Sequence, residues 1–243
     1  MKVFLMILYL TAVCYPFTAD EILDRNEENE NFRTSVSFNI EEVYNPGGSL
    51  RVSEMKAYSQ NGDEKVLLEY IEPKKVKGMK ILMLNNGDDI WFYSNRTNRV
   101  RKIAAHQKKQ SANNSDFSYQ DMSMSDYRKD YSYKLEGEEK RSGRECFRIS
   151  FSAKQKDAVY SRFTLWIDKT DYYTFAGEFF DETGRLWKML EVKNVKKTGK
   201  YWTAGEIEMK NVQKNSRTVV KTKDIMFDIE LPEEMFTERG LKR

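Results

Sequence analysis

Side chains that could perform catalytic chemistry are scarce in this chain of 243 residues, which contains one histidine and two cysteines. His106 lies among alanines and lysines in residues 104–109, and no carboxylate close to it in sequence could orient the imidazole. A solvated loop position fits this histidine better than a catalytic dyad or triad. The sequence therefore gives no histidine-based nucleophile and base of the usual kinds.

The cysteines do not indicate a metal or redox centre either. Cys146 stands in an alternating apolar pattern beside Phe147, and it lacks the second cysteine or histidine cluster that a zinc site requires. Carboxylates are abundant, so a pair of glycosidase type stays open, but no two of them stand out. Gly47 and Gly48 fit a hairpin turn better than a phosphate-binding loop. We predict no catalytic residue, no metal and no cofactor.

The first residues have the layout of a secretory signal peptide. Lys2 is followed by an apolar run, residues 3–13, which is too short to span a bilayer comfortably. We predict cleavage after Ala19, so that residues 1–19 are the signal peptide. Residues 20–243 then form a single domain that is exported from the cytoplasm.

A lipid anchor at Cys14 is the alternative for this leader, because residues 10–14 loosely imitate a lipobox. Val13 is larger than the residue wanted before such a cysteine, which favours simple cleavage. After cleavage only Cys146 remains, so the domain has no internal disulfide and depends on its core.

Charge is nearly balanced along the chain. The formal net charge is +3 and becomes +2 when Lys2 leaves with the signal peptide. A dedicated nucleic-acid binder would show a concentrated basic face and a high isoelectric point, so we predict no nucleic-acid partner.

The body of the sequence alternates with a period of two, which is typical of antiparallel strands with one buried face. A short helix over residues 19–31, capped by Asp20, precedes this pattern. We expect a mainly β fold, one large curled antiparallel sheet. The apolar positions of the clearest strands are Val36, Phe38 and Ile40; Val66, Leu68 and Tyr70; Phe147, Ile149 and Phe151; and Phe163, Leu165 and Ile167. Turn signals between strands lie at residues 45–48, 61–63, 85–88, 182–184 and 197–199.

Residues 104–128 interrupt the strand pattern, and loops of this length in a compact domain are usually functional or mobile. Residues 108–115 are polar and predict a flexible, hydrated hinge. Large apolar side chains then follow at close intervals, and the chain as a whole has 14 Tyr, 14 Phe, 4 Trp and 11 Met. Methionine suits adaptable pockets, although for any single one of these residues a place in the core of a curled sheet is favoured.

Three stretches, residues 91–100, 163–169 and 227–236, together resemble the outer-membrane lipoprotein-sorting protein family, relatives of the periplasmic carrier LolA. Residues 101–122 resemble the branch of that family found beside large efflux-type membrane transporters. Asn95 is a departure, because the family commonly has proline after its aromatic strand; asparagine can make the same turn.

This resemblance implies an unclosed antiparallel barrel whose apolar concave side is covered by a few short helices acting as a lid. It implies a monomeric, non-catalytic periplasmic carrier that shelters the acyl chains of a lipoprotein or lipid. The carrier would receive its cargo at an inner-membrane transporter and deliver it toward an outer-membrane acceptor. The alternative is an RseB-like lipid-sensing regulatory module that signals to a membrane partner. A hydrolase using paired carboxylates ranks third.

A carrier must hold its cargo in an apolar cavity under a lid held by few contacts. A shift of one residue in strand parity would exchange the inner and outer sets of wall residues. The basic residues between Ile90 and Ser115 could dock an acidic protein or anionic headgroups, or simply be solvated. Our candidates are Phe38, Ile40, Leu68, Tyr70, Trp91, Tyr93 and Ile103 for the wall; Phe117, Tyr119, Met122 and Met124 for the lid; and Arg96, Arg99, Arg101 and Lys102 for partner docking.

Overall fold

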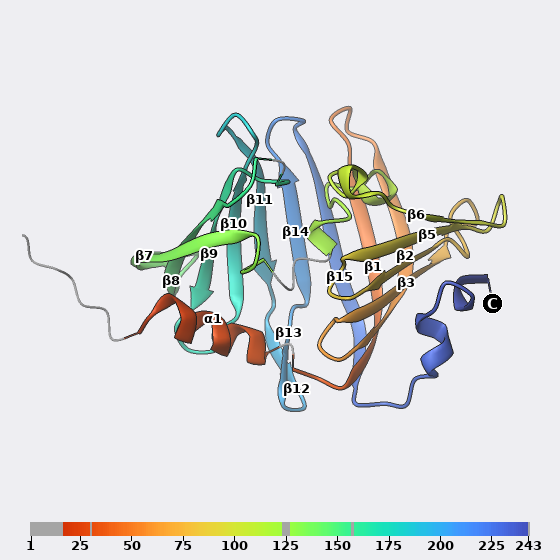
Figure 1. Ribbon diagram of the computed structural model, residues 1–243, viewed down its shortest axis with the longest axis horizontal. Coiled ribbons are helices and arrows are strands. Elements are labelled where there is room, and N and C mark those ends of the chain that lie inside the picture. Colours follow the sequence, from red (N-terminus) through yellow and green to blue (C-terminus); the bar gives the residue numbers. More distant parts are fainter. Residues whose placement is uncertain (1–16, 30, 123–126, 157, 243) are drawn as a thin grey trace, which may run out of the picture.

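One large antiparallel sheet dominates the computed structural model, which describes residues 17–29, 31–122, 127–156 and 158–242. In that part of the chain thirteen strands are joined in the order β6-β5-β4-β3-β2-β1-β15-β14-β11-β10-β9-β8-β7. The sheet curls without closing (Figure 1), so β6 and β7 are its two edges. The predicted fold class, a mainly β unclosed sheet with a few short helices, is confirmed.

The first half of the sheet is a meander in which each strand pairs with the next along the chain. Tight turns connect these strands, and at the turn between β4 and β5 Asn85, Asn86 and Gly87 adopt positive φ values of 56°, 54° and 81°. Asparagine and glycine tolerate this left-handed region best. The strands of this half are β1 (Thr34–Tyr44), β2 (Leu50–Gln60), β3 (Lys65–Glu72), β4 (Lys80–Leu84), β5 (Asp89–Ser94) and β6 (Arg99–Lys102).

The second half begins after the interruption at residue 104 and ends by returning to the first half. Its last strand pairs with β14 on one side and with β1 on the other, which joins the halves into one sheet. A short separate hairpin of β12 and β13 projects between β11 and β14. The strands are β7 (Tyr131–Arg141), β8 (Arg144–Ala153), β9 (Arg162–Asp168), β10 (Thr174–Phe180), β11 (Leu186–Lys193), β12 (Lys196–Thr198), β13 (Tyr201–Thr203), β14 (Glu206–Asn211) and β15 (Ser216–Phe227).

Helix α1 (Ala19–Glu28) packs against the second half of the sheet, with Ile22 and Leu23 fully buried in its aromatic core. Its N-cap is Thr18, whose hydroxyl accepts a hydrogen bond from the Glu21 N–H at 3.2 Å, and Glu21 completes a capping box. The predicted cap, Asp20, lies instead in the first turn, so that prediction was wrong by two residues.

The first half of the sheet is covered on both faces. The segment after β6 packs on the concave face, while η4 (Glu233–Phe236) and η5 (Gly240–Lys242) pack on the opposite face. Phe236 and Leu241 are buried there against Leu67 and Leu82. Strands β3 to β5 therefore bury side chains of both parities.

Across the described ranges of the chain, no helix has the length and apolar character needed to cross a membrane. The predicted signal segment lies largely outside these ranges, since residues 1–16 are not described.

Candidate functional site

Residues 103–122, which follow β6, fold over the concave face of the sheet, and we call them the crossing segment (Figure 1). It contains the short helices η1 (Ala105–Gln107) and η2 (Ala112–Asn114). The Ala112 N–H donates to the Phe117 carbonyl at 2.9 Å, and Ser111 and Ser118 form an isolated β-bridge. These bonds give the crossing segment a compact fold of its own.

Polar side chains fasten the crossing segment to the middle of the sheet. The buried Asp116 carboxylate accepts hydrogen bonds from the hydroxyls of Ser216 at 2.5 Å and Thr218 at 2.9 Å. Asn113 donates to the Glu41 carboxylate at 3.3 Å. The contacts therefore reach β15 and β1, where the two halves of the sheet meet.

A buried ion pair fastens the crossing segment to the second half of the sheet. The Lys188 Nζ lies 2.7 Å from Asp121 Oδ2, and the two side chains are only 4% and 2% exposed. The Tyr160 hydroxyl and the Ser118 N–H also donate to the Asp121 carboxylate. Because the attachments are many and buried, the expected hinge at residues 108–115 and a lid held by few contacts were both wrong.

Glu41 is a second buried carboxylate beneath the crossing segment. Its partners are the Tyr70 hydroxyl at 3.4 Å, Asn113 and the Arg51 guanidinium at 3.9 Å. Burial raises the pKa of Glu41 above its ordinary value of 4.5, and the attraction of Arg51 only partly opposes this effect. The charged form of Glu41 therefore destabilises the folded state at neutral pH.

We expect Glu41→Gln to raise the free energy of unfolding at neutral pH. The wild-type carboxyl contributes its full stability below about pH 4.5 and loses it as the pH rises through the higher folded pKa. The gain from the substitution should therefore appear above pH 4.5 and vanish below it, as measured by urea unfolding across pH.

Glu42→Gln is the matched control, because hydrogen bonds from Lys221 and Tyr44 lower the pKa of Glu42. That substitution should lower stability at neutral pH, and its effect should fade as the pH falls. The same sign for both variants would contradict the assignment for Glu41.

An apolar hollow of about 360 Å³, which we call the helix chamber, lies between α1 and the second half of the sheet and reaches Val66 and Met83 of the first half. Its α1 side carries Asn26, Asn29 and the exposed Glu27, so the hollow meets solvent there. Its deep side is apolar and mostly buried. The floor residues are Leu165, Phe179, Leu190, Val192, Ile207 and Met209.

A smaller hollow of about 220 Å³, which we call the strand chamber, lies under the crossing segment above the first half of the sheet. Its lining includes Met55, Leu68, Tyr70 and Val220, together with the Glu41 carboxylate. Both chambers are bordered by Phe117, Asp121, Met122 and Ile207.

The predicted wall residues divide between the two faces of the sheet. Leu68 and Tyr70 line the strand chamber, and Ile103 packs into the same buried cluster beside Ile81 and Ile90. These three residues lie on the concave side, as we predicted. Their contact with a ligand remains a prediction.

Phe38, Ile40, Trp91 and Tyr93 face away from the chambers, so their predicted wall positions were wrong. On β1 the alternate residue Glu41 lines the strand chamber, which turns Phe38 and Ile40 to the outer face. Trp91 and Tyr93 belong to the outer cluster that η4 and η5 cover. Each of these strands is shifted by one residue from the predicted parity.

The predicted lid residues are partly placed as expected. Phe117 and Met122 line both chambers. Tyr119 is 4% exposed and packs into the cluster around Ile103 instead of lining a chamber. Met124 lies outside the described residues.

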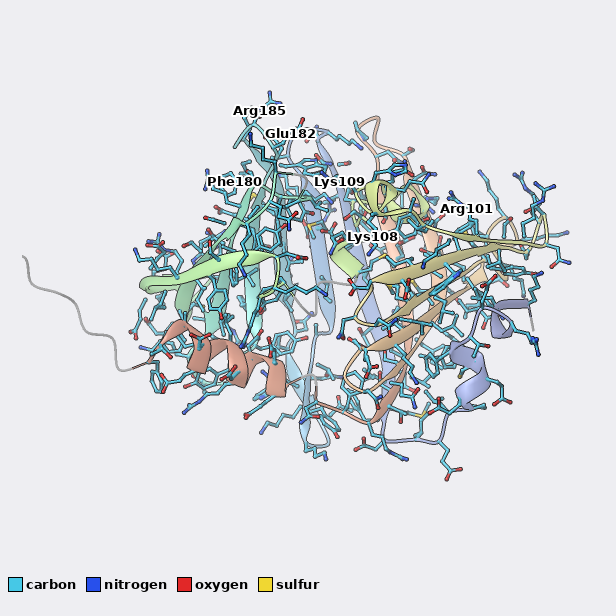
Figure 2. All side chains as sticks on the ribbon, in the orientation of Figure 1. Arg101, Lys108, Lys109, Phe180, Glu182 and Arg185 are labelled. Carbon is cyan, nitrogen blue, oxygen red and sulfur yellow. The ribbon has the colours of Figure 1, made fainter. Side chains whose placement is uncertain are left out.

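The predicted docking cations do not form one face. The Arg101 guanidinium stacks on the Phe92 ring, which is on the concave side. The Lys102 Nζ lies 5.1 Å from the centre of the Trp91 ring on the outer side and pairs with the Asp89 carboxylate. Figure 2 shows Arg101 at the β6 side of the molecule, apart from Lys108 and Lys109 of the crossing segment. Arg96 and Arg99 are exposed at the β5–β6 turn, and their docking role remains a prediction. Arg101 and Lys102 therefore lie on opposite sides of the edge strand β6.

Sequence reasoning missed the floor of the helix chamber. Leu165 was assigned to a strand but not to the site, and neither β11 nor β14 contributed a candidate. Leu190 and Val192 alternate on β11, and Ile207 and Met209 alternate on β14, so the period-two signal was present.

The residues considered for catalysis lie apart from the chambers. His106 is exposed on η1. Cys146 is fully buried on β8, and burial raises the pKa of its thiol to about 11, so the thiol is protonated at neutral pH. In the described ranges, no three His, Cys, Asp or Glu side chains gather as metal ligands would.

A protein-family model described as "Uncharacterized protein" matches residues 62–243 of the chain. No curated protein matches this chain.

Solved structures share the fold over nearly their whole length. A domain described as an outer membrane lipoprotein-sorting protein domain from Vibrio parahaemolyticus is 27% identical, with a TM-score of 0.84 over 92% of this chain and 97% of that one. A DUF1329 family protein from Desulfovibrio piger is 26% identical, with a TM-score of 0.84 over 91% and 96%. A LolA superfamily protein from Nitrosomonas europaea has the same fold at 18% identity, with a TM-score of 0.75 over 92% and 99%.

Proposed function

The chain belongs to the matched family and, with it, to the superfamily of outer-membrane lipoprotein-sorting, LolA-like proteins, and on this premise we propose that it is a non-catalytic carrier of acyl chains. Its cargo is an acylated lipoprotein or a lipid, which it shelters on the concave side of the sheet. It works in the periplasm, taking cargo at the inner membrane and delivering it toward the outer membrane.

The apolar helix chamber is the observation that supports this proposal most directly. Its floor residues Leu165, Phe179 and Met209 are only 6%, 3% and 2% exposed, yet they border an open hollow of about 360 Å³. Binding sites for small apolar ligands typically have about 300–1,000 Å³ and such a lining. Each methylene hidden from water contributes about 0.8 kcal/mol, so a chain of about sixteen carbons needs on the order of 10 kcal/mol of shelter.

Native mass spectrometry of the protein purified from the periplasm tests the proposal. We expect acylated molecules to leave with the protein, and a fluorescent fatty-acid probe to bind after they are removed. Absence of co-purifying lipid together with failure to bind the probe would show that the concave side is not an acyl site.

Release of the cargo distinguishes a carrier from the lipid-sensing alternative. Protein loaded with a fluorescent acyl lipid is mixed with acceptor vesicles, and transfer is followed by the change in fluorescence. A carrier should hand its load over, whereas a sensor should keep it and form a stable complex with a membrane partner. Retention of the lipid would favour the sensor over the carrier.

A further inference from the structure

The two chambers meet at a wall of four side chains. Phe117, Asp121 and Met122 of the crossing segment and Ile207 of β14 border both hollows. Phe117 and Met122 therefore lie between two apolar spaces, and we call these two residues the partition.

Phe117 and Met122 are less constrained by their neighbours than the other two residues of this wall. Asp121 is fixed by Lys188 and Tyr160, and Ile207 belongs to the sheet. Methionine has three rotatable bonds and fits irregular spaces, so Met122 can change its packing without moving the backbone. Phe117 is held through its carbonyl, which accepts a hydrogen bond from the Ala112 N–H, and it lines both chambers.

The chambers also differ in the exposure of their linings, because Glu27 of the helix chamber is exposed whereas every residue that lines the strand chamber is buried or half-buried. The helix chamber meets solvent beside the exposed Glu27, and a ligand's polar end would stay hydrated there. The strand chamber is bordered by buried residues such as Met55, Tyr70 and Ser115, which are 7%, 2% and 6% exposed. An acyl chain entering beside α1 would fill the helix chamber first and then meet Phe117 and Met122.

We propose that the two chambers are arranged in series and that Phe117 and Met122 set the length of the acyl chain that the protein accepts. This inference rests on the proposed function and adds the class of ligand, a single unbranched acyl chain that ends at the partition. Each methylene placed in the helix chamber tightens binding about fourfold. Methylenes beyond the partition find no apolar space, so affinity stops rising with chain length.

The test measures displacement of a fluorescent fatty-acid probe by unbranched saturated fatty acids from decanoate to stearate. For the wild-type protein, affinity should rise with length and reach a plateau. Met122→Ala and, independently, Phe117→Ala join the chambers, so the plateau should move to a longer acid, with about fourfold tighter binding for each methylene gained. Circular dichroism of each variant checks that it folds, and Phe117→Leu replaces Phe117→Ala if that variant does not.

Two further variants make the result specific. Met226→Ala is the matched control, because Met226 is 44% exposed and lies away from both chambers, and it should leave the plateau unchanged. Adding Val220→Phe to Met122→Ala refills the strand chamber and should remove the gain.

An unchanged plateau in folded Met122→Ala and Phe117→Ala would overturn the series arrangement while leaving acyl binding intact. A gain that survives the added Val220→Phe would overturn it as well. Failure of every fatty acid to bind the wild-type protein would instead remove the proposed function, and this inference with it.

Discussion

Lys188→Met is expected to lower the free energy of unfolding by about 3–5 kcal/mol. The substitution removes the cation that lies 2.7 Å from Asp121 and leaves a carboxylate that is 2% exposed without its charge partner. The hydrogen bonds from Tyr160 and Ser118 remain, but they do not neutralise the charge. Urea unfolding monitored by circular dichroism measures the loss.

The double variant Asp121→Asn with Lys188→Met separates the cost of an unpaired charge from the value of the pair. Each single variant leaves one buried charge alone, whereas the double variant leaves none. The asparagine Oδ1 can still accept from the Ser118 N–H, and its Nδ2 can donate to the Tyr160 hydroxyl oxygen. The double variant should therefore be more stable than either single one. Losses that simply add would contradict a direct coupling of the two residues.

Leu190→Trp is expected to weaken binding of a fluorescent fatty-acid probe at least about tenfold, or about 1.4 kcal/mol. Leu190 faces the helix chamber from β11, and an indole would occupy the space that an acyl chain needs. Because the side chain borders a hollow, the larger ring has room without displacing the core. Fluorescence titration gives the affinity, and thermal unfolding shows whether the fold is kept.

Glu191→Trp is the matched control for this substitution. Glu191 is the next residue on β11, and its side chain is 46% exposed in a surface ion pair with Lys193. Tryptophan on that side should leave the binding of the probe as it is in the wild-type protein. Equal weakening by both variants would mean that the probe binds somewhere other than the helix chamber.

Much of the fold could be predicted from local patterns. Four of the five turn signals fall in connections between paired strands, and the fifth, residues 197–199, overlaps the end of β12. Asparagine and glycine mark these turns because they tolerate positive φ better than other residues. Alternation located strands such as β3, β8 and β9, where one parity is clearly more apolar than the other.

Strand β1 shows why parity was harder to predict. Its concave side carries Ser37, Asn39 and Glu41, which use this side for hydrogen bonds: Asn39 donates to Ser37, and Glu41 accepts from Asn113 of the crossing segment. The apolar residues Phe38 and Ile40 took the outer side instead. A rule that turns apolar residues inward fails where the inner face is used for hydrogen bonding.

The predicted orientation of strand β5 was wrong for a different reason. Both of its faces are covered, one by the crossing segment and the other by η4 and η5. Trp91 and Phe92 are therefore both packed, and alternation gives no sign of which one faces the chambers. The outer cover comes from the end of the chain, so no local pattern around β5 could indicate it.

The attachment of the crossing segment depends on partners far away in sequence. Asp121 and Lys188 are 67 residues apart, and Asp116 meets Thr218 from 102 residues away. Composition alone made residues 108–115 look like a hydrated hinge. Only the fold brings these polar groups together, which converts a hydrophilic stretch into a well-anchored one.

The seam between β1 and β15 sets an order for the folding of this protein. Most strands pair with a close neighbour along the chain, so each half-sheet can form by local steps. The seam joins Tyr44 to Arg217, and closing so long a loop carries a large entropic cost that local hairpins avoid. The seam should therefore form last. Both chambers are lined from both half-sheets, so under the proposed function cargo can be loaded only after the seam has closed.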